Sequence, residues 1–598
     1  MIEAIPSLGR LSRPLPRNIA KGMIALTVSA LLACAVSAQR GPDQPETASG
    51  TAAKSLATAS RQMVAAANPY AVDAGMEILR AGGSAIDSAI ATQLVLALVE
   101  PQSSGRGGGA FILHWHKASR TLAGYDGRET APASAREDRF LTDGKPLAFD
   151  KAAHSGLSVG VPGLVRLMEH VHKIHGRLPW ARLFDPAIRL AEAGFQVSLR
   201  LNLLLRWQGA RNFDDTSRRY FFDEQDSARA AGSNLKNPEF AASLRAIAEK
   251  GSSAFYAGPI AQEIVAAVAR APNAPGDMEL DDLAGYAIQE REPVCVSYRA
   301  DRICGMGPPS SGGIAVAQTM KLIEPFDLGS KPEAAMNAPA LHLIAEAERL
   351  AYADRERYLT DPAFSLVPAG LIDTDYLATR RKLIDVARAM AKPEPGSPPG
   401  VDATTYGIDA TQENPGTSHI SIIDADGNAI AMTTTIEGAF GARIMAAGFL
   451  LNNELTDFSF RPRDEAGRPI ANRVEGGKRP RSSMAPTIVF DTHGEVKAVL
   501  GSPGGERIPL YVIKTLVALL DWKLDAQAAA ALPNFGSRGA TFEIELGGSA
   551  VWTALKVKPY GHAISTGLMT SGLHVIVRRN GALEGGADPR REGIAKGD

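Results

Sequence analysis

The 598-residue chain has no excess of charge of either sign, because 64 Lys and Arg stand against 65 Asp and Glu. A formal net charge of −1 supplies no field for binding nucleic acid or an acidic membrane surface. No hydrophobic run reaches the roughly 20 residues that a membrane-spanning helix needs. With 45% hydrophobic and 22% charged residues, the composition is that of an ordinary globular protein. We therefore expect neither a nucleic-acid partner nor a membrane span.

Sequence patterns for the common cofactor and metal sites are also missing. There is no phosphate-binding loop of the Walker type. The glycine-dense segment 105–110 loosely mimics a dinucleotide-binding turn, but it precedes a predicted strand instead of joining a strand to a helix. The histidines considered lack acidic or cysteine partners at ligand spacing: His114, His116, His170, His172 and His175. We expect no metal and no cofactor.

The N-terminus predicts a secretory signal peptide over residues 1–38. Basic residues, among them Arg17 and Lys21, precede an apolar run from Met23 to Ala35, and small side chains at Val36-Ser37-Ala38 favour cleavage before Gln39. The mature protein is then periplasmic or secreted. Residues 31–34 also resemble a lipoprotein box, which would leave Cys34 as a lipid anchor, and this alternative stays open.

Cysteine is scarce, with 3 residues in the whole chain. After ordinary signal cleavage only Cys295 and Cys304 remain, on either side of a segment that predicts two short strands and a turn. An oxidising compartment permits a cross-strand disulfide between them. The alternative is two half-buried thiols that never meet. Neither cysteine is expected to be catalytic.

The remaining pattern predicts helices followed by strands. Helices are expected over 70–79, 85–99, 161–175, 180–193 and 338–358, with Ser84 and Asp87 forming a capping box before the second. A Pro- and Gly-rich break over 392–415 separates them from strands at 419–423, 429–435, 448–451, 486–490 and 496–500, and from a helix at 508–520. Helices first and a sheet second, without repeats, predict a layered α+β fold.

Thr417 stands where the irregular segment meets the first of these strands. A Thr hydroxyl is a weak nucleophile, and one way to activate it is to make the Thr a new N-terminus whose α-amine is the base. That amine has an ordinary pKa of about 7.7–8.0, close to working pH. Cleavage between Gly416 and Thr417 would provide it. A plain strand start is the alternative that the local sequence itself leaves open.

Two further features suit acyl-transfer chemistry. Residues 499–507 run from a strand through Gly504 and Gly505 into a helix, where backbone amides converge and can stabilise an oxyanion; a simple tight turn is the alternative. Polar side chains also interrupt the apolar strands, and carboxylates together with hydroxyls and an Arg would suit an α-amino-acid head group. These polar residues are Thr433, Thr434, Thr435, Glu437, Asn452, Asn453, Glu454, Asp457, Ser482 and Ser483.

Ordered motifs from about Met63 to Gly593 resemble the γ-glutamyltranspeptidases, which belong to the N-terminal nucleophile hydrolase superfamily. The motifs are Glu100-Pro101-Gln102-Ser103-Ser104-Gly105, Asp126-Gly127-Arg128-Glu129-Thr130-Ala131-Pro132, Gly160-Val161-Pro162-Gly163, Pro308-Pro309-Ser310-Ser311-Gly312-Gly313, Gly416-Thr417-Ser418-His419, Leu451-Asn452-Asn453-Glu454, Lys478-Arg479-Pro480-Arg481-Ser482-Ser483-Met484 and Gly501-Ser502-Pro503-Gly504-Gly505.

The resemblance implies a four-layer αββα sandwich, autocleaved into a large subunit, residues 39–416, and a small subunit, residues 417–598, that stay together. It implies that the enzyme cleaves γ-glutamyl amides such as glutathione through a γ-glutamyl ester and passes the acyl group to water, amino acids or peptides. The implied roles are Thr417 as nucleophile, Thr435 as support of the new terminus, and Gly504 and Gly505 as oxyanion hole. Substrate binding falls to Arg128, Ser482 and Ser483 for the carboxylate and to Glu437, Glu454 and Asp457 for the ammonium.

The sequence departs from the family pattern in places. The loop between Ser459 and Lys478 lacks Tyr and Trp, which argues against an aromatic lid, and Arg481 occupies a position that is often apolar, which suggests an altered acceptor side.

One alternative function is an acylase with another acyl preference, such as a glutaryl β-lactam acylase, which would have no substrate ammonium to bind. The other alternative is an unprocessed binding protein.

Overall fold

The computed structural model describes residues 52–402, 404–411 and 416–598. The predicted signal peptide, including Cys34, lies outside the described residues. Within them, two large antiparallel sheets of seven strands each pack face to face. The first sheet has the strand order β1 (Ala57–Ala59), β22 (Ala582–Ala587), β21 (His574–Arg579), β17 (Val496–Gly501), β16 (Thr487–Phe490), β11 (Asp301–Gly305) and β10 (Val294–Tyr298). The second has the order β23 (Ile594–Gly597), β2 (Met63–Ala66), β12 (Thr417–Ile423), β13 (Ala429–Thr435), β3 (Gly109–His116), β4 (Thr121–Asp126) and β9 (Gln289–Arg291).

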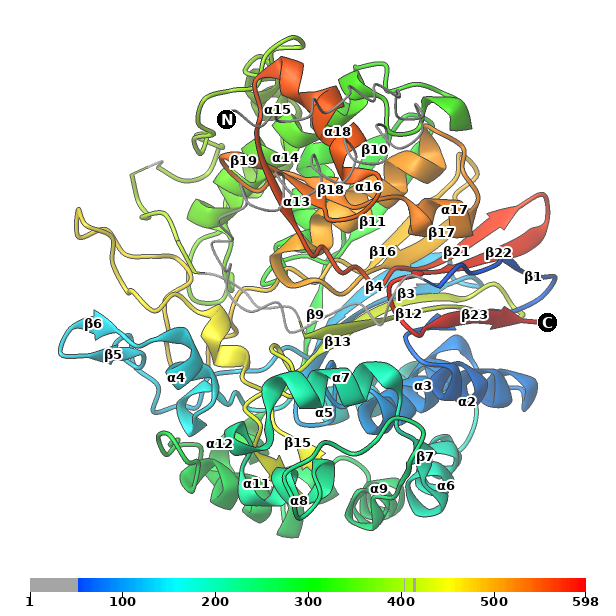
Figure 1. Ribbon diagram of the computed structural model, residues 1–598, viewed down its shortest axis with the longest axis vertical. Coiled ribbons are helices and arrows are strands. Elements are labelled where there is room, and N and C mark those ends of the chain that lie inside the picture. Colours follow the sequence, from blue (N-terminus) through cyan, green and yellow to red (C-terminus); the bar gives the residue numbers. More distant parts are fainter. Residues whose placement is uncertain (1–51, 403, 412–415) are drawn as a thin grey trace, which may run out of the picture. The chain divides into compact units, whose positions relative to one another are not determined.

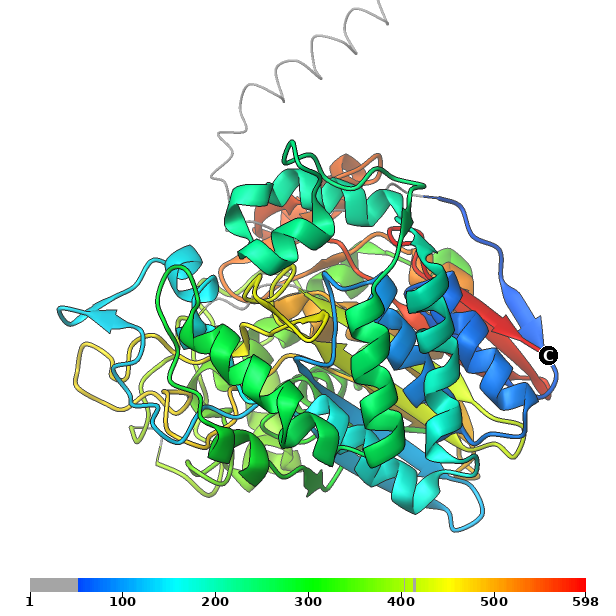
Figure 2. The same ribbon diagram turned by 90° about the horizontal axis from the view of Figure 1, so that it is seen from below.

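Helices cover the outer face of each sheet, so that the layers follow the order αββα (Figure 1). The first sheet is covered by α13 (Gly312–Ile323), α14 (Ala338–Tyr358), α16 (Ile508–Leu520) and α17 (Ala526–Ala531), with α15 (Thr374–Arg381) and α18 (Ala550–Val557) further out. The second sheet is covered by α2 (Pro69–Arg80), α3 (Ala85–Val99) and α5 (Leu164–His175). Seen from below, helices from the first half of the chain lie over the second sheet (Figure 2). The α+β sandwich class is thereby confirmed.

Smaller elements surround these four layers. The further helices are α4 (Phe149–Ala153), α6 (Asp185–Ala193), α7 (Leu199–Gln208), α8 (Asp215–Phe221), α9 (Pro238–Lys250), α10 (Ser253–Tyr256), α11 (Pro259–Ala269) and α12 (Leu280–Gly285). The short strand groups are β5 (Leu141–Thr142) with β6 (Lys145–Pro146), β7 (Phe195–Gln196) with β8 (Asn234–Leu235), β14 (Met445–Ala446) with β15 (Phe449–Leu450), and β18 (Phe535–Gly536) with β19 (Thr541–Glu545) and β20 (Ala563–Gly567).

Alternation along the strands of the second sheet builds two separate apolar cores. In β2, Val64 and Ala66 enter the core beneath α2 and α3, whereas Met63 and Ala65 enter the core between the sheets. The same alternation divides β13, where Met432 faces the helices. Successive strand side chains point to opposite faces, so a strand covered on both faces buries side chains on each of them. The strand β12 is buried along its whole length and lies between β2 and β13 in the second sheet.

Several local predictions are confirmed. The helix over 508–520 is α16, and the helix over 338–358 is α14. Ser84 and Asp87 form the predicted capping box, and every residue of α3 is buried. The helix predicted from residue 161 begins only at Leu164, after Gly163. Residues 180–184 form a 3-10 turn before α6.

One feature of the fold differs from the sequence prediction, and another decides between two alternatives that the sequence left open. Residues before 392 contribute strands to both sheets, so helices and strands are not segregated along the chain as the pattern predicted. Cys295 and Cys304 lie directly opposite each other in the β10–β11 hairpin and form a disulfide. Their pairing follows from strand register, which brings the two Cα atoms to 4.1 Å. No helix in the described part of the chain is long and apolar enough to cross a bilayer.

Candidate active site

Thr417 and Thr435 lie opposite each other at one end of the central strand pair. Thr417 begins β12, Thr435 ends β13, and the two are Cα partners in the antiparallel register. The Thr435 hydroxyl donates to the carbonyl oxygen of Gly416 at 2.8 Å and accepts from the backbone N–H of Glu437 at 2.7 Å. The carbonyl of the peptide bond preceding Thr417 is thus held by a side-chain hydroxyl.

Only glycine fits before Thr417. A Cβ at position 416 would stand 1.9 Å from the carbonyl oxygen of Glu437, because the backbone of residue 416 rests directly on Glu437 and Gly438. Glu437 itself has φ of 72°, a left-handed conformation that is rare outside glycine and concentrates at functional sites. The backbone before the peptide bond between Gly416 and Thr417 is therefore in close contact with the backbone of Glu437 and Gly438.

A single cavity gathers nearly all of the predicted site residues. It has a volume of about 20 Å³, and the residues that line it are Arg128, Thr417, Thr435, Glu437, Glu454, Asp457, Ser482, Ser483, Met484, Gly505 and Ile508. These residues come from segments up to 380 positions apart in the chain, and both large sheets contribute flanking loops. Of the predicted residues, Gly416 and Gly504 are not part of the lining, although each is the chain neighbour of a residue that is.

Arg128 is fixed at one side of the cavity by two carboxylates. Its guanidinium donates to Glu454 and, at 2.5 Å, to Asp457, both on the 3-10 turn Glu454–Asp457. The carbonyls of Pro480 and Arg481 accept two more of its N–H groups, at 3.2 and 2.8 Å. Burial alone would lower the pKa of Arg128, but the two carboxylates raise that pKa above its usual value. The group remains a cation inside the protein.

The other polar lining groups are held by hydrogen bonds from neighbouring residues. The Ser483 hydroxyl accepts from the Arg355 guanidinium at 2.7 Å, and the Ser482 hydroxyl accepts from the Met484 N–H at 3.2 Å. The Glu437 carboxylate accepts from the side-chain amide of Asn453. Each is thereby oriented by a neighbour, as positioned binding groups need to be.

Gly504 and Gly505 form the turn that leads into α16. Both have positive φ, 142° and 56°, and a Cβ on Gly504 would stand 2.5 Å from the Tyr511 ring. The 3-10 turn Gly505–Arg507 and then α16 follow, so the backbone amides of this segment lie at a helix start. Such amides are suited to stabilising negative charge on a reacting oxygen.

A buried charged network lies beside the start of β12. Ser418 points to the opposite face of β12 from Thr417, and its hydroxyl donates to Glu100 at 3.1 Å. Arg200 donates to the other oxygen of Glu100 at 3.0 Å. Burial raises the pKa of Glu100 to about 7, although Arg200 opposes that shift. The network ties the start of β12 to α7 and to the end of α3.

Three supporting residues were not assigned a role from the sequence. Arg355 holds Ser483, Asn453 holds Glu437, and Arg591 donates to the Thr417 carbonyl oxygen at 3.1 Å. Nothing in the sequence marks Arg355, because the burial of its side chain becomes visible only in the structure. Arg481 differs from its expected acceptor-side role, because its side chain is buried and faces Glu356 instead of the cavity.

Among the described residues, one group of three side chains has the arrangement of metal ligands. It consists of His342, Glu346 and His562, all buried, and none of them lines the catalytic cavity. The prediction of no metal rests on other histidines. It does not take account of His342 and Glu346, which lie one turn apart on α14.

Comparisons with known proteins show the family of this chain. Residues 71–598 match the family model described as gamma-glutamyltranspeptidase. The chain belongs to the γ-glutamyltranspeptidase family. It is 36% identical over 547 residues to the glutathione hydrolase proenzyme of Escherichia coli K12, covering 89% of this chain and 91% of that protein.

Solved structures show the same fold. The crystal structure of cephalosporin acylase from Bacillus halodurans has a TM-score of 0.79 at 27% identity, covering 94% of this chain and 99% of that one. The γ-glutamyltranspeptidase of Helicobacter pylori has a TM-score of 0.53 at 30% identity, covering 61% of this chain and 99% of that one. This γ-glutamyltranspeptidase family member is accordingly an enzyme with the N-terminal nucleophile hydrolase fold.

Proposed function

We propose that the protein is a γ-glutamyltransferase and glutathione hydrolase that matures by cutting its own chain between Gly416 and Thr417. The observation that carries the proposal is the single cavity in which Thr417 meets an Arg, three carboxylates and two Ser hydroxyls. An α-amino-acid head group offers one carboxylate and one ammonium, which match that set. The family and the name of the Escherichia coli relative support the same reaction.

Maturation begins with the Thr417 hydroxyl attacking the Gly416 carbonyl carbon. Thr435 already donates to that carbonyl oxygen and stabilises the charge that develops there. The C–N bond breaks, the Gly416 acyl group passes to the hydroxyl oxygen as an ester, and the former amide nitrogen takes up a proton. Water then hydrolyses the ester and leaves a carboxylate on Gly416 and a free amine on Thr417.

The free amine next serves as the base for catalysis. It takes the proton of the Thr417 hydroxyl as the oxygen attacks the γ-carbonyl of the substrate, and the amides of Gly504 and Gly505 receive the oxyanion. The C–N bond of the substrate breaks, and the leaving amine takes the proton. Water, or the amine of an amino acid or peptide, then resolves the γ-glutamyl ester by the reverse proton path.

Substrate selection rests on the charged groups around the cavity. Arg128, Ser482 and Ser483 bind the α-carboxylate, while Glu454 and Asp457, with Glu437, bind the ammonium. Binding then replaces the direct pairing of Arg128 with the two acids by pairing through the substrate. The carboxylates favour a glutamyl group over a glutaryl group, which has no ammonium. No cofactor takes part.

The two product chains stay together because their strands pair with one another in the same sheet. The second sheet alternates β2, β3, β4 and β9 from before the cut with β12, β13 and β23 from after it. Separating the chains would therefore unpair strands in the middle of the molecule. We place the mature enzyme in the periplasm or outside the cell, on the strength of the predicted signal peptide and the disulfide.

Paired anilide substrates test the proposal. The mature enzyme is expected to hydrolyse γ-glutamyl-p-nitroanilide roughly 10–100-fold faster than glutaryl-p-nitroanilide, since a hydrogen bond to a charged group contributes about 1.5–3 kcal/mol. Equal rates would favour the acylase alternative. No hydrolysis of either substrate by fully folded protein would support the binding-protein alternative.

A further inference from the structure

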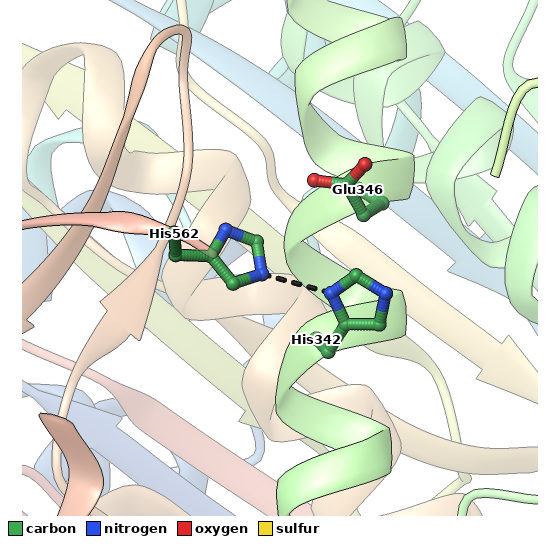
Figure 3. Close-up of side chains that lie close together, drawn as sticks. All are labelled: His342, Glu346 and His562. Carbon is green, nitrogen blue, oxygen red and sulfur yellow. Dashed lines mark hydrogen bonds between the residues drawn. The ribbon is translucent and has the colours of Figure 1, made fainter. Parts of the chain in front are cut away.

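A second cluster of reactive side chains lies away from the catalytic cavity, between α14 and the C-terminal part of the chain. His342 and Glu346 are one turn apart on α14, and His562 comes from the segment that leads into β20 (Figure 3). One ligand atom from each of the three lies within 4.8 Å of the other two. His342 and Glu346 are fully buried, and His562 is 8% exposed.

The hydrogen bonds of His342 fix which of its ring nitrogens carries a lone pair. Its Nε2 lies 2.7 Å from the carbonyl oxygen of Asp385, which only accepts, so Nε2 carries the proton. The Nδ1 of the neutral ring is then an acceptor, and it faces the Nε2 of His562 at 2.8 Å. A second ring nitrogen bound to a backbone carbonyl is the usual support of a metal-ligating histidine.

We propose that His342 Nδ1, His562 Nε2 and the Glu346 carboxylate form a binding site for a divalent transition-metal ion of the Zn²⁺ type. Two imidazoles and one carboxylate are a donor set that Zn²⁺ accepts, with a water in the fourth position. The metal replaces the proton shared between the two rings. His562 then carries its proton on Nδ1, so its charge is unchanged.

The surroundings hold His342 and Glu346 in place. The Tyr560 ring stacks on His342 at 4.3 Å between centroids. The Met390 N–H donates to one oxygen of Glu346 at 2.7 Å, and this hydrogen bond fixes the orientation of the carboxylate.

Two features oppose binding and set its expected strength. Arg349 donates to the other oxygen of Glu346 at 2.8 Å, and its positive charge weakens the attraction for a cation. The two ring nitrogens are also closer than the roughly 3.4 Å that tetrahedral Zn–N bonds of about 2.0–2.1 Å require, so the rings must part by about 0.6 Å. We expect a single site of moderate affinity that is selective against Mg²⁺ and Ca²⁺, which prefer oxygen ligands.

The three proposed ligands come from both sides of the proposed cleavage point. His342 and Glu346 precede Thr417 in the chain, and His562 follows it. If the chain is cut as proposed, the metal joins the large and small subunits, and this bridging role rests on the proposed function. The binding site itself does not, because it forms in the uncut chain as well.

Metal titration of the tag-free protein tests the site. Co²⁺ is added to chelator-treated protein while visible absorption is followed, and Zn²⁺ is measured by competition with a chromophoric chelator. The wild type is expected to bind one equivalent. His562→Ala and Glu346→Gln should each weaken binding at least about 100-fold, since outer-shell partners alone are worth 10–100-fold. His493→Ala, at an exposed turn, is the matched control and should bind like the wild type.

The outcomes separate this site from the proposed function. Absence of binding to the wild type, or equal binding by His562→Ala, would overturn the metal site whatever the activity of the enzyme. Binding by an uncut Thr417→Ala protein should equal that of the wild type. Zn²⁺ should raise the unfolding temperature of the cut wild type but not that of His562→Ala. A wild-type protein that is never cut yet binds the metal would contradict the self-cleavage and leave the metal site intact.

Discussion

The hydroxyl of Thr435 donates a hydrogen bond to the carbonyl oxygen of Gly416, 2.8 Å away, across the β12–β13 pair. This contact joins the residue opposite Thr417 to the peptide bond at which we propose that the chain is cut. Because the same hydroxyl accepts from the Glu437 N–H, its proton is directed at that oxygen. In the self-cleavage that we propose, this donor is therefore already in place at the carbonyl under attack.

Removing this hydroxyl should slow maturation. Thr435→Val keeps the branched shape but leaves the Gly416 carbonyl without its donor, and loss of one oxyanion donor costs about 10²–10³ in rate. Thr435→Ser retains the hydroxyl and should mature much faster than Thr435→Val. The fraction of cut chain, followed over time on denaturing gels, measures both. Equal maturation of the two variants would show that the hydrogen bond has no part in the cleavage.

Arg128 should control the affinity for the substrate carboxylate. Arg128→Lys keeps a cation beside Glu454 and Asp457 but loses the fork of the guanidinium, so KM for γ-glutamyl substrates should rise by one order of magnitude or more. Arg128→Ala leaves the two acids buried without their cation and is also expected to destabilise the fold by about 3–5 kcal/mol. Steady-state kinetics with a thermal-unfolding control separates the two effects. An unchanged KM in a folded Arg128→Lys enzyme would remove Arg128 from the substrate site.

The Glu100 carboxyl should make stability depend on pH. Its pKa is raised by burial to about 7, above the ordinary value of 4.5 that applies in the unfolded chain. The folded state therefore holds this proton more tightly, and the stability it contributes is present below about pH 4.5 and is lost as the pH rises through 7. Glu100→Gln should remove that part of the pH dependence.

Denaturant unfolding at pH 5 and pH 7.5 measures the effect. The wild type should lose more stability than Glu100→Gln between the two values, whereas Glu465→Gln, at an exposed position, should follow the wild type. An identical pH dependence in wild type and Glu100→Gln would mean that Glu100 titrates as in the unfolded chain.

The disulfide should contribute to stability but not to catalysis. Cys295 and Cys304 close a loop with a sequence separation of 9 and neither lines the cavity. Replacing both by Ser should lower the free energy of unfolding by about 2–3 kcal/mol in the loop-entropy relation. The kcat and KM values should not change at a temperature where both proteins are folded. A loss of activity in the folded variant would point to a role beyond the hairpin.

Local features were predictable from the sequence because their causes are local. The capping box of Ser84 and Asp87, the limits of α16 and the strand over 429–435 follow from residues within a few positions of one another. The contribution of early strands to both sheets does not, because pairing such as that of β3 with β13 joins segments more than 300 residues apart.

Local pattern singles out Thr417 and the turn at Gly504 and Gly505, but the role of Arg128 and the division of the substrate-binding residues come only from resemblance to a family. Arg128 meets Glu454 across 326 positions, and nothing near either residue in the sequence announces that contact. Arg355 and Arg591 were missed for the same reason. The spacing of His342 and Glu346 was visible in the sequence, but their partner His562 lies 220 positions from His342.

Intact-mass analysis under denaturing conditions tests the central claim most directly, once on the resting protein and once after acid quenching with a γ-glutamyl donor present. The account predicts two chains, the smaller one comprising residues 417–598 with Thr417 at its N-terminus, and a gain of one γ-glutamyl group on that chain after quenching. Thr417→Ala should give one uncut chain that gains nothing. A single uncut wild-type chain, a cut elsewhere, or acylation of the larger chain would contradict the assignment of Thr417 as the nucleophile.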